Sequence, residues 1–198
     1  MKLSKRGEYA LRTLINLGIA KDVGRTLVQV SELSENEQLP IKFLEQIMQT
    51  LKEGGLVTSV RGKFGGYRLA REPKEITIGS VVRLVDGPLA PIGCVSQSAY
   101  EKCTCPDEAH CGLRMLMLDV RNAIAGILDR YTLADVVGIT LRKLRRDNLP
   151  IPFSPEADAT PIARVPARFA QRMAAGGGKP RLSETEGIVH QLLGEYTI

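Results

Sequence analysis

The sequence predicts a mainly α-helical fold with one small β-hairpin, and three patterns support this expectation. Apolar residues recur at helical spacing in several segments, the longest of which spans residues 112–130. The glycine-rich turn Arg61-Gly62-Lys63-Phe64-Gly65-Gly66 separates two short segments of β type at 56–60 and 67–70. The net charge of +5 lies entirely in residues 1–83, which carry 14 Lys and Arg against 9 Asp and Glu. A basic segment of this kind suits a phosphate-binding surface.

The first three helices are expected to follow one another closely. A helix should run from Ser4, its N-cap, to about Ala20, and a short second helix should span 28–36. A three-residue turn at 37–39 then leads to a third helix with Pro40 at its first position and Gly54 at its end. Three helices followed by a basic-tipped hairpin is the element order of a winged helix-turn-helix.

The rest of the chain divides into helices and irregular segments. Thr77 is expected to cap a fourth helix over 78–85, which Asp86-Gly87-Pro88 ends. Residues 88–111 have little periodic pattern. After the helix at 112–130, Thr132 is expected to cap another that runs to about residue 146. Residues 149–182 hold six of the eleven prolines and the run at 176–178 of three glycines, a composition typical of a linker or flexible tail.

The third helix and the hairpin tip carry the residues expected to contact DNA. A helix in the major groove reads base edges, and a hairpin wing holds phosphates or enters the minor groove. Gln can bond adenine at two atoms, and Glu can accept a bond from cytosine. The predicted DNA-binding residues are Lys42, Glu45, Gln46 and Gln49 in the helix, and Arg61 and Lys63 in the wing.

Several classes of protein are disfavoured by the same sequence. No apolar run approaches the roughly 20 residues that cross a bilayer, and no signal peptide follows the basic N-terminus. We therefore expect a cytoplasmic protein without a membrane partner. No nucleophile–base pair, phosphate loop or paired-carboxylate motif occurs, so we expect no enzyme. An interaction module that had lost DNA binding should also have lost its basic wing, yet Arg61 and Lys63 remain.

All four cysteines, Cys94, Cys103, Cys105 and Cys111, lie within 18 residues. Disulfides are rare in the cytosol, so this grouping indicates metal binding or redox chemistry. Three interpretations stay open: an iron–sulfur cluster, a structural zinc ion although the usual paired knuckles are missing, and a thiol–disulfide switch without metal. His110 can join any of them.

Several motifs in this order resemble one bacterial family of winged-helix regulators. They are Tyr9-Ala10-Leu11-Arg12, Phe43-Leu44-Glu45-Gln46-Ile47, the run from Gly54 to Leu69, Asp86-Gly87-Pro88, and Tyr131-Thr132-Leu133-Ala134-Asp135-Val136. The family contains the iron–sulfur-cluster assembly regulator, the nitric-oxide-sensing nitrite-stress repressor and the cysteine-metabolism repressor. The resemblance covers roughly residues 1–137.

The resemblance implies a dimeric regulator, expected to be a repressor, that binds a pseudo-palindromic operator in double-stranded DNA. Glu45, Gln46 and Arg61 match positions that contact DNA in relatives, and residues 112–130 match the helix that pairs two protomers. The expected division is therefore a DNA-binding domain at 1–86, a cysteine-containing sensor loop at 87–111, dimerisation helices at 112–148 and a flexible tail at 149–198. Relatives without the cysteines respond to a partner protein.

The resemblance also suggests which residues hold a [2Fe–2S] or [4Fe–4S] cluster. Cys105 and Cys111 keep the family's five-residue spacing, and Cys94 is the expected third ligand. Cys103 is spare or an alternative, because it does not keep the five-residue spacing to Cys111, and we expect its side chain to point away from that of Cys105. Arg114 stands where one relative has a histidine ligand. Other relatives use a carboxylate near the start of the first helix, so the resemblance implies Glu8, which stands at that place, as the candidate fourth ligand. The alternative is a metal-free thiol–disulfide or partner-controlled regulator of cysteine or sulfur metabolism.

Overall fold

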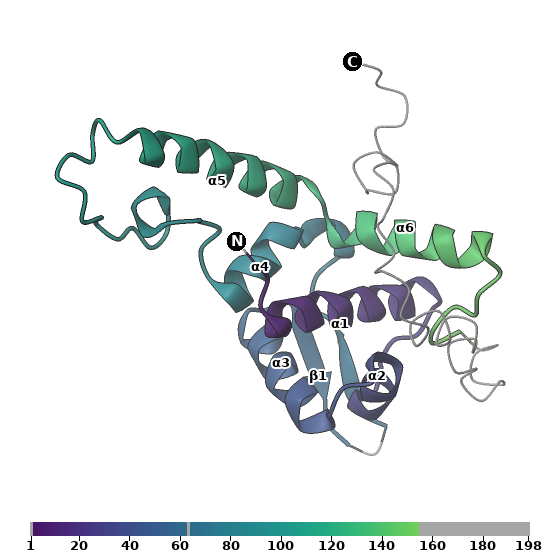
Figure 1. Ribbon diagram of the computed structural model, residues 1–198. Helices are drawn as coiled ribbons and strands as arrows, with labels where there is room; N and C mark the ends of the chain where they lie inside the picture. Colours follow the sequence, from purple (N-terminus) through teal and green to yellow (C-terminus); the bar gives the residue numbers. More distant parts are fainter. Residues whose placement is uncertain (1, 63, 155–198) are drawn as a thin grey trace, which may run out of the picture.

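The computed structural model describes residues 2–62 and 64–154. Figure 1 shows α1 in the centre, with α2, α3 and the hairpin on one side of it and α4, α5 and α6 on the other. A mainly α-helical fold with one hairpin is thereby confirmed. In chain order the described elements are α1 (Lys5–Asp22), α2 (Val30–Glu37), α3 (Ile41–Glu53), β1 (Val57–Val60), β2 (Gly66–Leu69), η1 (Pro73–Glu75), α4 (Ile78–Asp86), η2 (Gly93–Val95), α5 (Gly112–Arg130) and α6 (Leu133–Arg146).

Helix α1 forms the centre of the hydrophobic core. It begins where expected, because the hydroxyl of Ser4 accepts a hydrogen bond from the backbone N–H of Gly7 at 2.9 Å. The helix then contacts α2, α3, α4, α6 and β2, and the side chains of Ala10 and Leu14 are fully buried. Four of the other helices and one strand of the hairpin are therefore positioned against α1.

Helix α2 begins at Val30, two residues later than the sequence predicts. Gln29 is its N-cap, and the Glu32 carboxylate accepts the backbone N–H of Gln29 at 2.7 Å. Val28, expected inside the helix, instead pairs with Tyr67 of the hairpin through two backbone hydrogen bonds. This pairing fixes the start of the helix-turn-helix relative to the wing.

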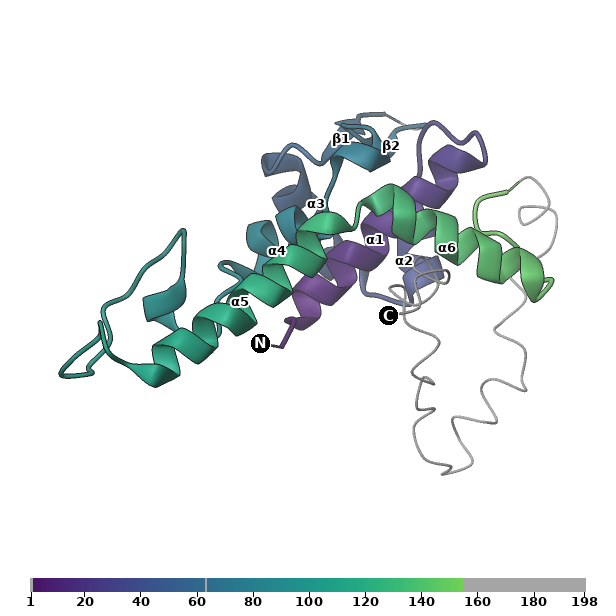
Figure 2. The same ribbon diagram turned by 90° about the horizontal axis from the view of Figure 1, so that it is seen from above.

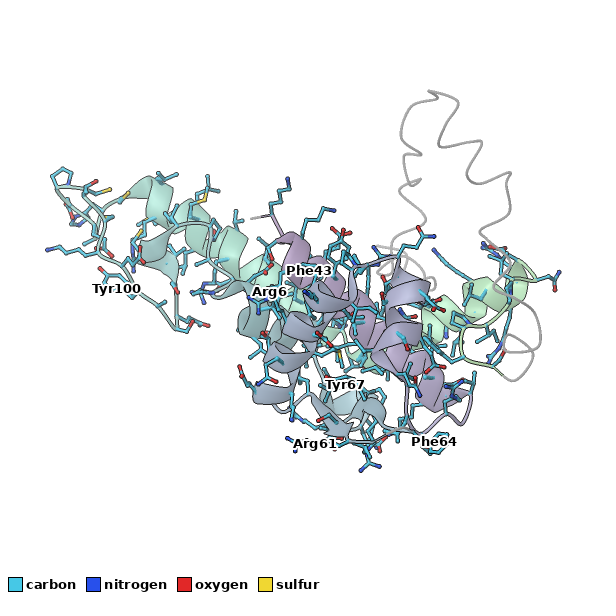
Figure 3. All side chains as sticks on the ribbon, turned by 90° about the horizontal axis from the view of Figure 1, so that it is seen from below. Arg6, Phe43, Arg61, Phe64, Tyr67 and Tyr100 are labelled. Atoms are coloured by element: carbon cyan, nitrogen blue, oxygen red, sulfur yellow. The ribbon has the colours of Figure 1, made fainter. Side chains whose placement is uncertain are left out.

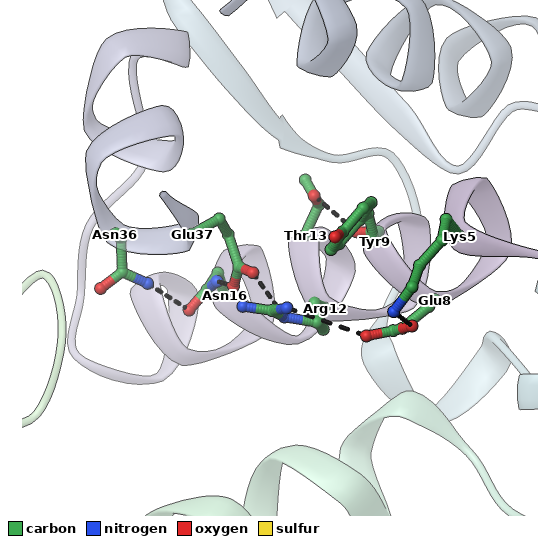
Figure 4. A network of polar contacts seen from close by, with 8 residues as sticks. All are labelled: Lys5, Glu8, Tyr9, Arg12, Thr13, Asn16, Asn36 and Glu37. Atoms are coloured by element: carbon green, nitrogen blue, oxygen red, sulfur yellow. Dashed lines mark hydrogen bonds and ion pairs between the residues drawn. The ribbon is translucent and has the colours of Figure 1, made fainter. Parts of the chain in front are cut away.

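The turn between α2 and α3 is held by a polar network on α1. Gln38 adopts the left-handed conformation, with φ of 53°, that ends α2, and Pro40 is the N-cap of α3 and not its first residue. Next to this turn the buried Glu37 carboxylate forms an ion pair with Arg12 at 2.6 Å and accepts a hydrogen bond from Asn16 (Figure 4). A buried carboxylate persists only when it is paired, so the network fixes α2 against α1.

The wing is a two-stranded antiparallel hairpin in which Val57 lies opposite Leu69. Its turn depends on glycine at particular positions. Gly62 has φ of 111°, a conformation that other residues rarely adopt. A Cβ atom at Gly65 would collide with the carbonyl oxygen of Val60. The glycines therefore keep the two strands close together at the tip.

Helices α4, α5 and α6 follow the predicted boundaries closely. The Thr77 hydroxyl caps α4, and Thr132 and Asp135 form a capping box at the start of α6. Helix α5 extends away from the domain. The cysteine loop (residues 87–111), which precedes α5 in the sequence, lies at the far end of this helix (Figure 2). Within α5 no residue is buried.

The start of the predicted tail packs on the domain. We expected flexibility from residue 149 onward, but the side chain of Phe153 is only 7% exposed and belongs to the hydrophobic core, with Ile151 packed against it. The proline-rich composition of the segment did not predict this packing. Composition describes the whole segment, whereas a single aromatic side chain that buries a large apolar surface is enough to anchor it. The remainder of the predicted tail, 155–198, lies outside the described residues.

Candidate nucleic-acid interface and cysteine loop

The predicted base-reading residues of α3 all lie on one exposed face. Lys42, Glu45, Gln46 and Gln49 are exposed, whereas the opposite side of the helix carries buried apolar side chains. The four residues line a single open groove of about 600 Å³. Apolar residues at intervals of three and four place one face of α3 in the core. The same periodicity places the polar side chains together on the opposite, exposed face.

The structure adds three residues to this groove that the sequence analysis missed. Arg6, in the first turn of α1, donates a hydrogen bond from its guanidinium to the Thr50 hydroxyl of α3 at 2.6 Å. Both residues line the groove, together with Glu53. The basic start of the chain was visible in the sequence, but its position beside α3 was not. Arg6 is thus a candidate phosphate contact at the edge of the helix.

The wing carries its exposed groups at the tip, as Figure 3 shows for Arg61 and Phe64. The side chain of Phe64 is 83% exposed, and the sequence analysis gave it no role. Lys63, the second predicted wing cation, lies outside the described residues. An arginine and an aromatic ring at the end of a glycine-bounded hairpin are groups that can approach a DNA groove closely.

Glu8, the predicted fourth ligand, is occupied by neighbouring cations on α1. Its carboxylate forms an ion pair with Lys5 at 2.7 Å and approaches Arg12 at 4.0 Å (Figure 4). The hydrogen bond from Lys5 holds the pKa of the Glu8 carboxyl below its usual value. Among the described contacts, none joins Glu8 to a thiol of the same chain.

The four thiols of the cysteine loop form a chain of neighbours. Cys94 is buried in η2, and Cys111 is the N-cap residue of α5. The sulfur atoms of Cys105 and Cys111 are 4.0 Å apart. Cys103 interacts with both Cys94 and Cys105. All four are free thiols.

This arrangement corrects one expectation about Cys103. We expected Cys103 and Cys105 to point to opposite sides of the loop, but the two thiols are neighbours. The expectation was wrong in its reasoning, because side chains alternate along an extended segment and residues two apart therefore lie on the same side. Cys103 thus neighbours two other thiols, as Cys105 does.

Burial and mutual contact raise the pKa of two of these thiols, Cys94 and Cys105. Burial, followed by the neighbouring Cys103 and Glu108, raises the pKa of the Cys94 thiol. Hydrogen bonds with Cys103 and Cys111 raise the pKa of Cys105 to about 11. A metal would therefore have to displace protons from the loop.

Glu108 connects several residues of the cysteine loop and its surroundings. Its carboxylate accepts a hydrogen bond from the Tyr100 hydroxyl at 2.8 Å, contacts the sulfur of Cys103 at 3.9 Å and forms an ion pair with Arg114 at 3.1 Å. His110 is turned to Asp107 instead, at 2.6 Å. Arg114 thus supports the loop through Glu108.

Within residues 2–62 and 64–154, no three His, Cys, Asp or Glu side chains are grouped closely enough to hold one metal ion. In the same residues, no helix combines the length and the apolar character needed to cross a membrane.

Comparisons with known proteins agree with this geometry. Residues 3–139 match the Rrf2 family, which is described as an iron-dependent transcriptional regulator. An rrf2-like HTH-type regulator of Rhodobacter capsulatus is 36% identical over 138 residues, which are 68% of this chain and 91% of the relative. The solved structure of CymR, the global cysteine regulator of B. subtilis, is 32% identical with a TM-score of 0.57 and covers 70% of this chain and 98% of its own. The structure of T. potens IscR is 28% identical with a TM-score of 0.55 and covers 71% of this chain and 88% of its own.

Proposed function

Because this chain belongs to the Rrf2 family of transcriptional regulators, we propose that it binds a pseudo-palindromic operator as a homodimer and adjusts its affinity through an iron–sulfur cluster on the cysteine loop. The chain is a helix-turn-helix regulator and not an enzyme. The observation that carries the proposal is the chain of four neighbouring thiols at the end of α5.

Helix α5 supports the homodimer. The side chains of Leu113 and Leu116 are 58% and 57% exposed, and that of Ile127 is 51% exposed. None of residues 2–62 and 64–154 covers these side chains, and an uncovered apolar stripe is a surface that packs against another chain. A second copy of α5 is the natural partner, because the spacing of three and four is that of a two-helix seam. The stripe consists of Leu113, Leu116, Val120, Ile124 and Ile127.

Light scattering after size-exclusion chromatography tests the dimer. Leu116→Glu places a charge in the stripe and should give a monomer that loses operator affinity. Asn122→Glu, which adds the same charge off the stripe, should remain a dimer. Dimeric mass for Leu116→Glu would exclude α5 as the interface.

The donor set of the loop suits an iron–sulfur cluster. Thiolates are its usual ligands, and they bind different iron atoms, so they need not converge on one point. We assign Cys94, Cys105 and Cys111 as ligands, with Cys103 as spare or alternative and Glu8 as the candidate fourth ligand. When bound, the cluster supplies a centre whose state responds to iron, redox or nitric-oxide status. In the part of the chain that the structure describes, no group of side chains converges on one point, which gives a single zinc ion less support.

Helix α4 offers a route from this loop to the DNA-binding face. On one side, Arg83 of α4 binds Asp129 of α5 through two hydrogen bonds of 2.6 and 2.7 Å. At its end, next to the loop, Asp86 accepts hydrogen bonds from the backbone and the hydroxyl of Ser4. Ser4 caps the helix that carries Arg6, so a shift of α4 moves one wall of the groove.

Protein purified without oxygen tests the cluster. Visible absorption, iron and sulfide should be lost in Cys94→Ser, Cys105→Ser and Cys111→Ser and retained in Cys103→Ser. Operator affinity should differ between the loaded and the cluster-free protein. Loss of colour in Cys103→Ser with colour retained in Cys105→Ser would exchange the roles of these two residues.

A metal-free switch is the second candidate, favoured by the 4.0 Å separation of the Cys105 and Cys111 sulfur atoms. Oxidation by peroxide would join them in a disulfide, with release of two protons and two electrons to the peroxide. Thiol counting after peroxide should then show two thiols lost per chain and a changed operator affinity. Protein that contains no iron and loses no thiols would point to control by a partner protein, as part of cysteine or sulfur metabolism.

A further inference from the structure

A second cavity, of about 480 Å³, lies on a part of the domain that neither the α3 groove nor the cysteine loop uses. It is bounded by the C-terminal half of α1, the connection that follows it and both strands of the hairpin. Its volume is within the range of small-molecule sites. Part of its wall is apolar and belongs to the core, because Leu17, Ala20 and Val28 are each at most 3% exposed.

Backbone hydrogen bonds hold the walls of this cavity in place. The N–H of Arg25 donates to the carbonyl of Ala20 at 2.8 Å, which folds the connection back onto α1. Val28 and Tyr67 exchange two hydrogen bonds of 3.0 and 2.8 Å, which join the connection to the hairpin. These hydrogen bonds therefore fix the backbone of the three segments that bound the cavity.

The cavity has a positive lining. Lys21, Arg25 and Arg68 line it, and none of the lining residues is acidic. Lys21 is held by an ion pair with Glu72, and Arg25 by one with Glu32, each at 2.7 Å. A ligand that carries a negative charge is favoured next to such a lining.

Arg68 is the cation best placed to bind that charge. Its Nε donates to the Thr58 hydroxyl of the facing strand at 3.3 Å. No carboxylate of residues 2–62 and 64–154 forms an ion pair with it. A guanidinium has five N–H donors, and two of them can bind a carboxylate in parallel.

We propose that this cavity binds a small organic anion. Its carboxylate pairs with Arg68, and its apolar body lies against the less deeply buried apolar lining residues, Tyr67 and Leu69. The two requirements act together, since the charge selects an anion and the apolar part of the wall selects an apolar chain or ring. Because the cavity is bounded by both the hairpin and α1, the bound anion connects the wing to the central helix.

Titration of the full chain with acetate, butyrate and hexanoate, followed by amide NMR shifts, tests the proposal. Each methylene buried against the apolar wall should tighten binding about fourfold, so hexanoate should bind far more tightly than acetate. The amides of Thr58 and Arg68 should shift. Equal affinity for the three acids, or no saturable binding of any of them, would overturn the proposal.

Matched variants locate the site. Arg68→Gln should weaken hexanoate binding at least tenfold. Arg71→Gln should not, because Arg71 lies outside the cavity and donates to the carbonyl of Glu75. Ala70→Leu, at an exposed lining position, should fill the cavity and also weaken binding. If inorganic phosphate shifted the same amides as strongly as hexanoate, the cavity would be a general anion contact, such as one for a DNA phosphate, and the proposal would be wrong.

Discussion

Substitution of Arg6 by glutamine tests whether the groove along α3 faces DNA. Arg6 is exposed and lies against α3 through its hydrogen bond to Thr50. With Lys42 in the same groove and Arg61 at the wing tip, the described residues provide three candidate phosphate-binding cations per protomer, and thus six per dimer. Because Arg6 is exposed, its loss should change the free energy of unfolding by no more than about 0.5 kcal/mol.

The effect on DNA binding should be much larger and depend on salt. Each phosphate contact contributes about 0.9 to the slope of log affinity against log salt concentration. Arg6→Gln removes one cation from each protomer, so the slope should become shallower by about 1.8. For a fourfold rise in salt, the wild-type protein should therefore lose about 12 times more affinity than the variant does.

Fluorescence anisotropy with an operator selected from random DNA measures this slope. Lys52→Gln is the matched control, because Lys52 is an exposed cation of α3 that does not line the groove. Gln46→Ala should instead leave the slope unchanged and reduce discrimination at one base pair by about 1–3 kcal/mol. An unchanged slope for Arg6→Gln would refute the assignment and leave Arg6 with a role in holding α1 against α3.

Three further predictions concern the core, the helix-turn-helix and α4. Phe153→Ala should destabilise the protein by about 3 kcal/mol and lower Tm by about 6–12 °C in calorimetry. A chain that ends after residue 154 should keep its Tm. An unchanged Tm for Phe153→Ala would show that the segment is not anchored. Glu37→Ala leaves two polar partners unsatisfied and should lower the free energy of unfolding, measured with urea, by about 1–3 kcal/mol. The exposed control Glu35→Ala should lower it by less than about 0.5 kcal/mol. Equal losses for the two variants would contradict the network. Arg83→Ala breaks a half-exposed ion pair with Asp129 and should lower the free energy of unfolding by less than about 1 kcal/mol. It should nevertheless reduce the difference in operator affinity between the protein with a bound cluster and the cluster-free protein. An unaltered difference would argue against the route through α4.

Local chemistry made most of the helices predictable. Ser4, Thr77 and Thr132 were expected as N-caps, and each accepts a hydrogen bond from the backbone N–H three residues later. The exposed face of α3 was predictable for the same reason, because helical periodicity places its polar residues together. The start of α2 was displaced because Val28 pairs with the hairpin, a contact that spacing within the helix does not encode.

The sequence by itself determined the winged-helix order, the polar face of α3 and the presence of four thiols on one loop, because caps, periodicity and composition act within a few residues. Only the tertiary structure decided that Arg6 lies beside Thr50, 44 residues away, that Cys103 meets both Cys94 and Cys105, and that Phe153 enters the core. These contacts join segments whose local patterns are independent of each other. Their formation depends on how the packed helices and the irregular loop are placed in space, since burial and side-chain reach are properties of the whole fold.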